Sequence, residues 1–285
     1  MSKSLLACAI SGSESALVRI KTSGSGRYII TACRTVPVGS SDLAGRKQPH
    51  TVRKLLSLAD EWRGETLALC VCPDAYFPLN AYFPGSLRQD ARRDYCRIEA
   101  THFLERPDDY LYDHVPYTEN TGDPVEKHLV LFYRAEPFKA LAESFASQHP
   151  LLFCGSPLQP EVYRSRITGG KAAFLDLGRC HISLTVAENG RLAFFSCHRI
   201  KDRQEAEYFA IHELKSHPDC REHDVHASGE MADRKMIRLL EKETSCRVVP
   251  PDIPRGVEFS GRNTSAFRSS AVAKAVTTAL MAIGI

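Results

Sequence analysis

An aspartate and a glycine, Asp176 and Gly178, stand where a buried apolar run at residues 172–177 ends. A glycine turn lets backbone N–H groups approach a phosphate, because no Cβ stands in the way. A carboxylate at such a strand end can hold Mg²⁺ through water or orient an attacking water. Asp and Gly are also common turn formers. The sequence therefore predicts either a phosphate-binding turn or a purely structural one.

A second glycine turn near the N-terminus is similar to this one. Ser11-Gly12-Ser13 is followed, like Gly178, by apolar residues that alternate with a period of two, which is typical of a half-buried strand. Each strand then turns at a Gly-Arg pair, Gly26-Arg27 or Gly190-Arg191, and an apolar strand resumes. Asn189 before Gly190 strengthens the hairpin signal. Two such hairpins in one chain indicate a duplicated domain.

Helical and strand patterns alternate through the rest of the chain, which is typical of an α/β protein. The apolar C-terminal stretch at 271–285 contains Lys274 and two threonines, so we interpret it as a docked terminal helix and not as a membrane span. We expect helices at 52–62, 86–104, 138–145, 203–217 and 233–244, and strands at 66–72, 128–133 and 224–227.

Composition narrows the class of protein. With 285 residues, 43% of them apolar, the chain can form one large domain or two small ones. The net charge is only +3, which argues neither for nor against nucleic acid. The arginines between 88 and 97 could meet an acidic partner or nucleic acid, but they are interleaved with Asp90 and Asp94, so we expect a solvated charged face and no nucleic-acid partner. The ten cysteines are scattered and no secretory signal is recognisable, which predicts free thiols and a cytoplasmic location.

The order of these motifs resembles the actin-like ATPase superfamily, and within it the PilM family of type IV pilus assembly and the cytoplasmic domain of GspL. Four stretches carry the resemblance. The second phosphate motif with its hairpin resembles AAFLDLGRCHISLTVAENGRLAFF, and the family's helix, proline loop and acidic-aromatic strand resemble DARRDYCRIEATHFLERPDDYLYDHVPY. The strand and helix that follow resemble HLVLFYRAEPFKALAESF, and the adenosine motif resembles DVHASGEMADRKMIRLLEKETSCRVVPPDIP. Glu99-Ala100 and Asp113 hold the signature positions of the second stretch.

The resemblance implies a duplicated ribonuclease-H-like fold with a small inserted α+β subdomain. The first lobe would span 1–170 with the insertion at about 84–145, and a reduced second lobe would span 171–285. Two glycine turns and an adenosine turn would face a cleft for ATP and Mg²⁺. The nucleotide-binding candidates that match these motifs are Ser11, Gly12, Ser13, Asp176, Gly178, Gly229 and Glu230.

The nucleotide motifs depart from the family pattern at three points. No carboxylate precedes the first turn, where Ile10 stands opposite Asp176 or Leu177. Glu230 follows Gly229 where paired glycines are usual, and only residues 201–223 replace the subdomain that closes over the nucleotide. A missing general base alone costs about 10²- to 10⁴-fold in rate. We therefore expect a degenerate, non-catalytic site that binds nucleotide weakly or uses no cofactor; the alternative is an ATP-dependent phosphotransferase or ATPase with Asp176 as its base.

By the same resemblance, a short cytoplasmic peptide of a membrane partner would bind near the inserted subdomain, and a homodimer is a further hypothesis. The candidate residues are Tyr95, Ile98, Phe103, Tyr110 and Tyr112, with strand addition along 110–117 as one mode. The alternative is that these aromatics form the core of the subdomain. The His/Cys stretch at 212–226 has ligands for zinc but fits no standard spacing, so we expect no metal and a solvated connection there.

Overall fold

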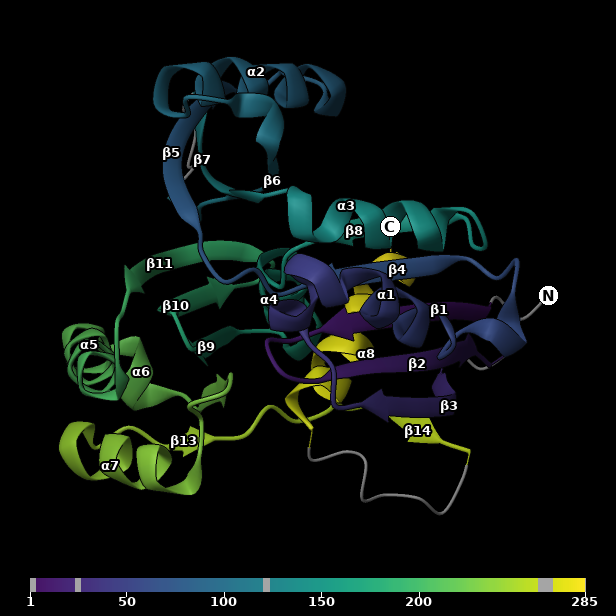
Figure 1. Cartoon of the computed structure of the whole chain (residues 1–285). Helices are drawn as coiled ribbons and strands as arrows, with labels where there is room; N and C mark the ends of the chain where they lie inside the picture. The colour runs from purple at the N-terminus through teal and green to yellow at the C-terminus, as the bar shows by residue number, and fades with distance from the viewer. Residues whose placement is uncertain (1–3, 24–26, 120–123, 261–268, 285) are drawn as a thin grey trace.

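Two large sheets form the two lobes of the computed structural model, which describes residues 4–23, 27–119, 124–260 and 269–284 (Figure 1). The five strands of one sheet correspond in order to five of the six strands of the other, which has β14 added at its edge. The first sheet has the order β14-β3-β2-β1-β4-β8, and the second has the order β11-β10-β9-β12-β13. In each, an antiparallel meander continues into parallel strands. The first comprises β1 (Ser4–Ile10), β2 (Ser15–Thr22), β3 (Tyr28–Val36), β4 (Leu67–Val71), β8 (Leu151–Gly155) and β14 (Val257–Phe259). The second comprises β9 (Lys171–Leu177), β10 (His181–Glu188), β11 (Arg191–Arg199), β12 (Val225–Ser228) and β13 (Val248–Val249).

The strand register defines how the two copies correspond. The last pair before the turn holds Ile10 on β1 in one copy and Leu177 on β9 in the other. Ala9 is therefore the counterpart of Asp176, and the first copy carries no carboxylate at this position. The β10–β11 turn has positive φ angles at Asn189 and Gly190, 52° and 83°, as a two-residue hairpin of the predicted kind requires.

Helices cover both faces of each sheet. On the first sheet, α1 (Gln48–Leu56) and α3 (Glu136–Ala146) pack on one face and α8 (Ser270–Gly284) on the other. On the second, α5 (Arg203–Ser216), α6 (Asp219–Glu222) and α7 (Arg234–Thr244) share one face. Another helix, α4 (Leu158–Thr168), packs against both β10 and α8. Because α4 and α8 meet between the sheets, they join the two lobes.

A small third sheet projects from the lobes, at the top of Figure 1. It contains β5 (Phe77–Pro84), β7 (Val125–Arg134) and β6 (Tyr110–Pro116), and α2 (Gln89–Phe103) covers one face. This subdomain begins before the expected boundary at 84, because Pro84 ends β5 and does not open the insertion. It also ends before 145, because α3 contributes Phe138, Leu141 and Phe145 to the core of the first lobe.

The chain returns to the first lobe after β13. β14 pairs with β3, and α8 packs against β1, β2 and β4, so 171–285 does not form a self-contained second lobe. The reason lies in α8, whose residues from Ala271 to Ala282 are all buried. A helix that is apolar on every side needs cover on every side. Within the described ranges, no helix has the length and hydropathy to cross a bilayer.

Candidate functional site

Six of the seven predicted nucleotide-binding residues line a single cavity between the lobes: Ser11, Gly12, Asp176, Gly178, Gly229 and Glu230. Ser13 is exposed in the first turn and does not line it. The cavity volume is about 20 Å³, which is close to what a single water molecule needs. The fold thus brings the predicted residues together around a space far smaller than a nucleotide.

Asp176 of the second sheet and Lys274 of α8 form a buried ion pair that connects the two lobes. Lys274 reaches out of α8, and its Nζ lies 3.2 Å from Oδ1 of Asp176, with each residue 8% exposed. The hydroxyl of Ser228 donates a 2.9 Å hydrogen bond to the same oxygen. Burial alone would raise the pKa of Asp176, but the Lys274 ammonium and the His181 ring hold this pKa well below its usual range. Burial opposes the charge on Lys274, and the carboxylate nevertheless raises its pKa well above the ordinary value.

His181, the first residue of β10, makes a second connection across the cleft. Its Nδ1 lies 3.1 Å from the backbone oxygen of Asp74 in the first lobe, and its Nε2 lies 3.3 Å from Oδ2 of Asp176. The ring also packs edge-on against Tyr76, with centroids 5.0 Å apart. Burial lowers the pKa of His181, but the contact with Asp176 outweighs it and raises the pKa. Asp176 therefore carries charge contacts to two basic side chains.

Glu230 fills the space in front of the first glycine turn. A Cβ on Gly12 would overlap the Glu230 carboxylate, so the side chain lies directly against the Gly12 backbone. Gly229 has a φ of +100° and approaches the Leu177 backbone so closely that a Cβ would overlap it. The turn predicted to bind adenosine thus places a carboxylate directly against the glycine turn that was predicted to bind phosphate.

These residues do not fit Mg²⁺ or a phosphate in this arrangement. Mg²⁺ binds oxygen ligands and retains several waters, whereas Asp176 is already neutralised by an ammonium group in a cavity with room for about one water. Across the described residues, no group of three or more His, Cys, Asp or Glu side chains is placed to hold a metal ion. The chemistry that the geometry does support is a fixed electrostatic connection between two lobes.

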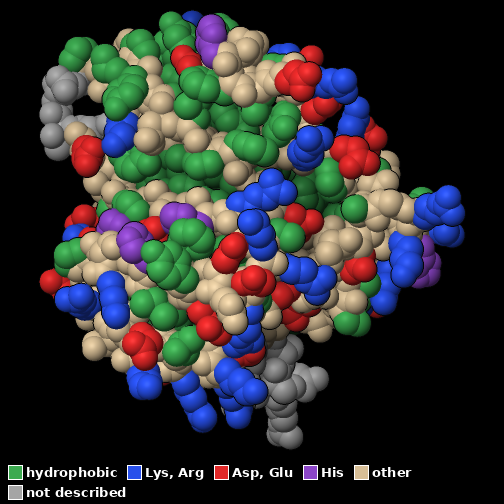
Figure 2. All heavy atoms as spheres, turned by 60° about the vertical axis from the view of Figure 1, so that its left-hand side comes forward, with side chains coloured by type: hydrophobic (Ala, Val, Ile, Leu, Met, Phe, Trp, Pro, Cys, Tyr) green, Lys and Arg blue, Asp and Glu red, His purple; other side chains and the backbone are tan. Residues whose placement is uncertain are grey.

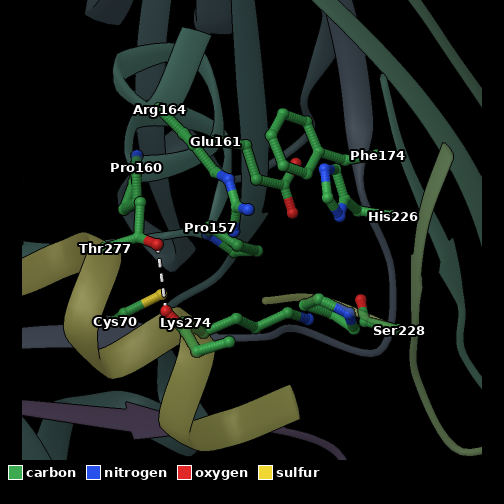
Figure 3. A pocket seen from close by; sticks show the side chains of 12 residues that line it. Cys70, Pro157, Pro160, Glu161, Arg164, Phe174, His226, Ser228, Lys274 and Thr277 are labelled. Atoms are coloured by element: carbon green, nitrogen blue, oxygen red, sulfur yellow. Dashed lines mark hydrogen bonds between the residues drawn. The ribbon is translucent and has the colours of Figure 1, made fainter. Parts of the chain in front are cut away.

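Lys274 also borders a second cavity on its other side, shown in Figure 3. This space of about 30 Å³ is lined by Glu161 and Arg164 of α4 and by His226 of β12. Arg164 forms an ion pair with Asp252, and His226 stacks on Phe174 with the ring centroids 5.6 Å apart. Burial raises the pKa of the Glu161 carboxyl to about 8, although Lys274 acts in the opposite direction.

Sequence reasoning missed Lys274, His181 and Ser228 as parts of the site. Lys274 left a signal, because it is the one charged residue in the apolar run at 271–285. Buried lysines are rare unless they are paired, so its position on an apolar helix predicts a buried carboxylate partner. His181 and Ser228 left no comparable signal, since each follows or precedes a turn whose spatial neighbours depend on the packing of the lobes.

A groove of about 570 Å³ is lined by residues of α2, of β6 with the segment before it, and of β7. Three of the five predicted partner-binding residues, Ile98, Tyr110 and Tyr112, line it together with Phe132 of β7. Tyr95 and Phe103 do not line this groove but are 42% and 63% exposed on the same helix. Hydrophobic side chains gather on the upper part of the face in Figure 2, at the height of the small sheet in Figure 1.

The aromatic residues of β6 serve partly as packing within the subdomain. Tyr112 donates a 3.0 Å hydrogen bond to the backbone oxygen of Arg93, and Tyr110 and Tyr112 both pack on the core beneath α2. β6 is an edge strand that pairs with β7, and Thr118 just beyond it donates to the backbone oxygen of Leu192 in the second sheet. Strand addition along β6 remains a prediction.

The His/Cys stretch at 212–226 is ordered as α5, α6 and β12 and is not an open connection. Cys220 is fully buried in the core of the second lobe, and His226 faces the second cavity. The side chains of His212 and His217 instead surround the carboxylate of Glu213 at 3.7 and 4.0 Å.

Comparison with known proteins identifies the fold. The chain is similar to a solved PilM–PilN type IV pilus biogenesis complex, with a TM-score of 0.72, 15% identity and 98% of each chain covered. It is also similar to a Bacteroides thetaiotaomicron protein with an actin-like ATPase fold and unknown function, with a TM-score of 0.50, 10% identity, and 86% and 90% of the two chains covered. No family model and no curated protein matches the sequence. The predicted PilM-like, actin-like ATPase fold is confirmed.

Proposed function

We propose that this protein is a non-catalytic, actin-like scaffold of the cytoplasm. In this proposal the Lys274–Asp176 ion pair closes the former nucleotide cleft, and the groove beside α2 binds a short cytoplasmic segment of a membrane protein in a pilus or secretion assembly. The observation that carries the proposal is the buried ion pair at the position where a nucleotide would need Mg²⁺. The similarity to a PilM–PilN complex supports the choice of partner.

Nucleotide entry would require the ion pair to break. Separating two buried charges that contact each other has a free-energy cost, which lowers the affinity for any ligand that separates them. The triphosphate would also meet the Glu230 carboxylate at the Gly12 turn. Like charges at short range oppose binding. Both effects favour a scaffold over a nucleotide-dependent protein.

The phosphotransferase alternative receives less support. A general base works best when its pKa lies near the working pH. Burial acts to raise the pKa of Asp176, but Lys274 and His181 lower it well below its usual range. This carboxylate is therefore a poor proton acceptor. The segment between β11 and β12 consists of α5, α6 and short connections, which are too small to close over a substrate.

The groove has the character of a peptide site. Its lining includes the apolar and aromatic side chains of Ile98, Tyr112 and Phe132 and the charged side chains of Arg97 and Asp108. A lining with apolar side chains and both charges suits a short amphipathic segment whose apolar side chains enter the groove. The exposed Tyr95 and Phe103 beside the groove extend the apolar surface along α2.

Photocrosslinking in the producing cells tests the partner assignment. A photoreactive amino acid replaces Ile98 in the groove, and the matched control carries it at Leu152, which is 49% exposed on β8. We expect the groove variant to crosslink to the cytoplasmic segment of a membrane protein and the control not to. Ile98→Asp should abolish copurification of that partner. Equal crosslinking from both positions, or a crosslinked partner without a membrane segment, would contradict the proposal.

A further inference from the structure

The second sheet has an open outer edge. β11 is the last strand on this side of the sheet, next to β10 (Figure 1). At its start, Leu192 pairs with Tyr117 and accepts a 2.8 Å backbone hydrogen bond from the N–H of Thr118. Beyond Leu192, no backbone group in the described parts of the chain bonds to the outer side of β11. The segment after β6 thus begins a strand pairing at this edge that the rest of β11 leaves open.

The register of β11 identifies which backbone groups face outward. Both backbone groups of a residue in an antiparallel strand point to the same side, and the side alternates along the strand. The oxygen of Leu192 points away from β10, the register shifts at Ala193, and the N–H of Ile200 points back to the oxygen of Cys180. By this alternation, three residues direct their N–H and C=O groups outward: Phe195, Cys197 and Arg199. An edge with free groups of this kind is a template for an added strand.

A pocket of about 480 Å³ lies where β11 ends. It is lined by Arg199 and Lys201 and by two aromatic residues of α5, Phe209 and the 65% exposed Tyr208. Both cations are exposed, and within the described residues neither forms an ion pair. Glu205, which also lines the pocket, instead accepts the backbone N–H of Lys201 at 2.8 Å. The edge strand therefore leads into a pocket with two available positive charges and an exposed aromatic ring.

We propose that the edge of β11 binds an acidic, extended segment of another protein by strand addition. The backbone of the segment pairs with Phe195, Cys197 and Arg199, and one of its carboxylates enters the pocket beside Arg199 and Lys201. Charge-assisted hydrogen bonds from such cations are about twice as strong as neutral ones. A second copy of this chain would bring the same two cations to the edge, so the charge of the site favours a different, acidic partner. The site shares no lining residue with the groove beside α2 and does not rest on the function proposed for that groove.

Fluorescence anisotropy with the full-length protein tests the charge requirement. The probe is a short labelled peptide in which Asp and Glu alternate with Val, and the control peptide has Lys in place of the acidic residues. We expect only the acidic peptide to bind at concentrations up to millimolar. Arg199→Glu combined with Lys201→Glu should weaken this binding about tenfold or more. The matched control combines Lys215→Glu and Arg221→Glu, which change the net charge equally at exposed positions of α5 and α6, and it should bind like the wild type.

Hydrogen exchange tests the strand addition itself. Binding of the acidic peptide should slow amide exchange at residues 195–199, because the outward N–H groups gain acceptors. Cys197→Pro removes one of these N–H groups at a position where an edge strand can hold proline, and it should abolish binding. Circular dichroism checks that the variant is folded, and the exchange measurement on the wild type decides the question independently of this variant.

Several results would overturn the proposal. No binding of the acidic peptide, equal binding of the Lys peptide, or equal weakening by the control variant would refute the charge assignment. Unchanged exchange at 195–199 in the peptide complex would refute strand addition. Loss of binding in Ile98→Asp would place the peptide in the groove beside α2 and not on β11. Sedimentation velocity covers the other occupant: a wild-type dimer that Cys197→Pro converts to a monomer would assign the edge to a second copy instead.

Discussion

Replacing Lys274 with methionine tests whether the ion pair holds the lobes together. The substitution keeps the length of the side chain and removes its charge, which leaves Asp176 buried with only Ser228 and His181 nearby. An uncompensated buried charge costs about 3–5 kcal/mol. At about 2–4 °C per kcal/mol for a chain of this size, we expect the melting temperature of Lys274→Met to fall by roughly 10 °C.

A double-mutant cycle isolates the contribution of the pair. Urea unfolding is measured for the wild type, Lys274→Met, Asp176→Asn and the double variant. Once the carboxylate is gone, the lysine no longer has a negative partner, so the double variant should lose less stability than the sum of the single changes, with a coupling above about 1 kcal/mol. Lys242→Met is the control, because Lys242 is 81% exposed on α7 and its ion pair with Glu243 spans 3.9 Å. Additive effects within about 0.5 kcal/mol would refute the reasoning.

Three other changes probe the same account. Burial raises the pKa of Glu161 to about 8, so the folded state binds this proton more tightly than the unfolded state does. The free energy of unfolding should therefore fall as the pH rises from about 4.3 to 8. Urea titrations across this window should show a weaker pH dependence of stability for Glu161→Gln than for the wild type. Asp176 raises the pKa of His181 against the effect of burial. The stabilising contribution of the protonated His181 should therefore be present below about pH 6.5 and be lost at higher pH. Compared with the wild type, His181→Gln should be less stable at pH 6 and nearly equal in stability at pH 9. Gly190 has a φ of +83°, so thermal melts should show Gly190→Ala destabilised by about 1–2 kcal/mol, while Gly170→Ala, which faces open space, should be nearly neutral.

The sequence predicted the local structure of the cleft well. Period-two alternation after Gly12 and Gly178, and the Asn189-Gly190 pair, are local signals, and the structure has hairpins at both places. The buried strands and amphipathic helices are likewise encoded by nearby residues. Even the clustering of Gly12, Gly178 and Gly229 could be expected, since strand ends of a duplicated fold converge on one cleft.

What the sequence did not predict depends on contacts between distant segments. Lys274 lies 98 residues from Asp176, and nothing local to either residue specifies the pair. The same holds for α8, whose return to the first lobe follows from its need for apolar cover on both sides. The edges of the inserted subdomain were missed because Phe77–Pro84 reads equally well as a strand of either sheet until its partner β7 is known.

Calorimetric titration with ATP and Mg²⁺ tests the central claim most directly. The wild type and Asp176→Ala should both be titrated at neutral pH, with folding checked by circular dichroism. Because the ion pair and Glu230 occupy the cleft, we predict no binding heat for either protein up to millimolar ATP. Micromolar binding by the wild type that Asp176→Ala abolishes would contradict the account, since it would make Asp176 a ligand of the nucleotide site and not the anchor of a closed cleft.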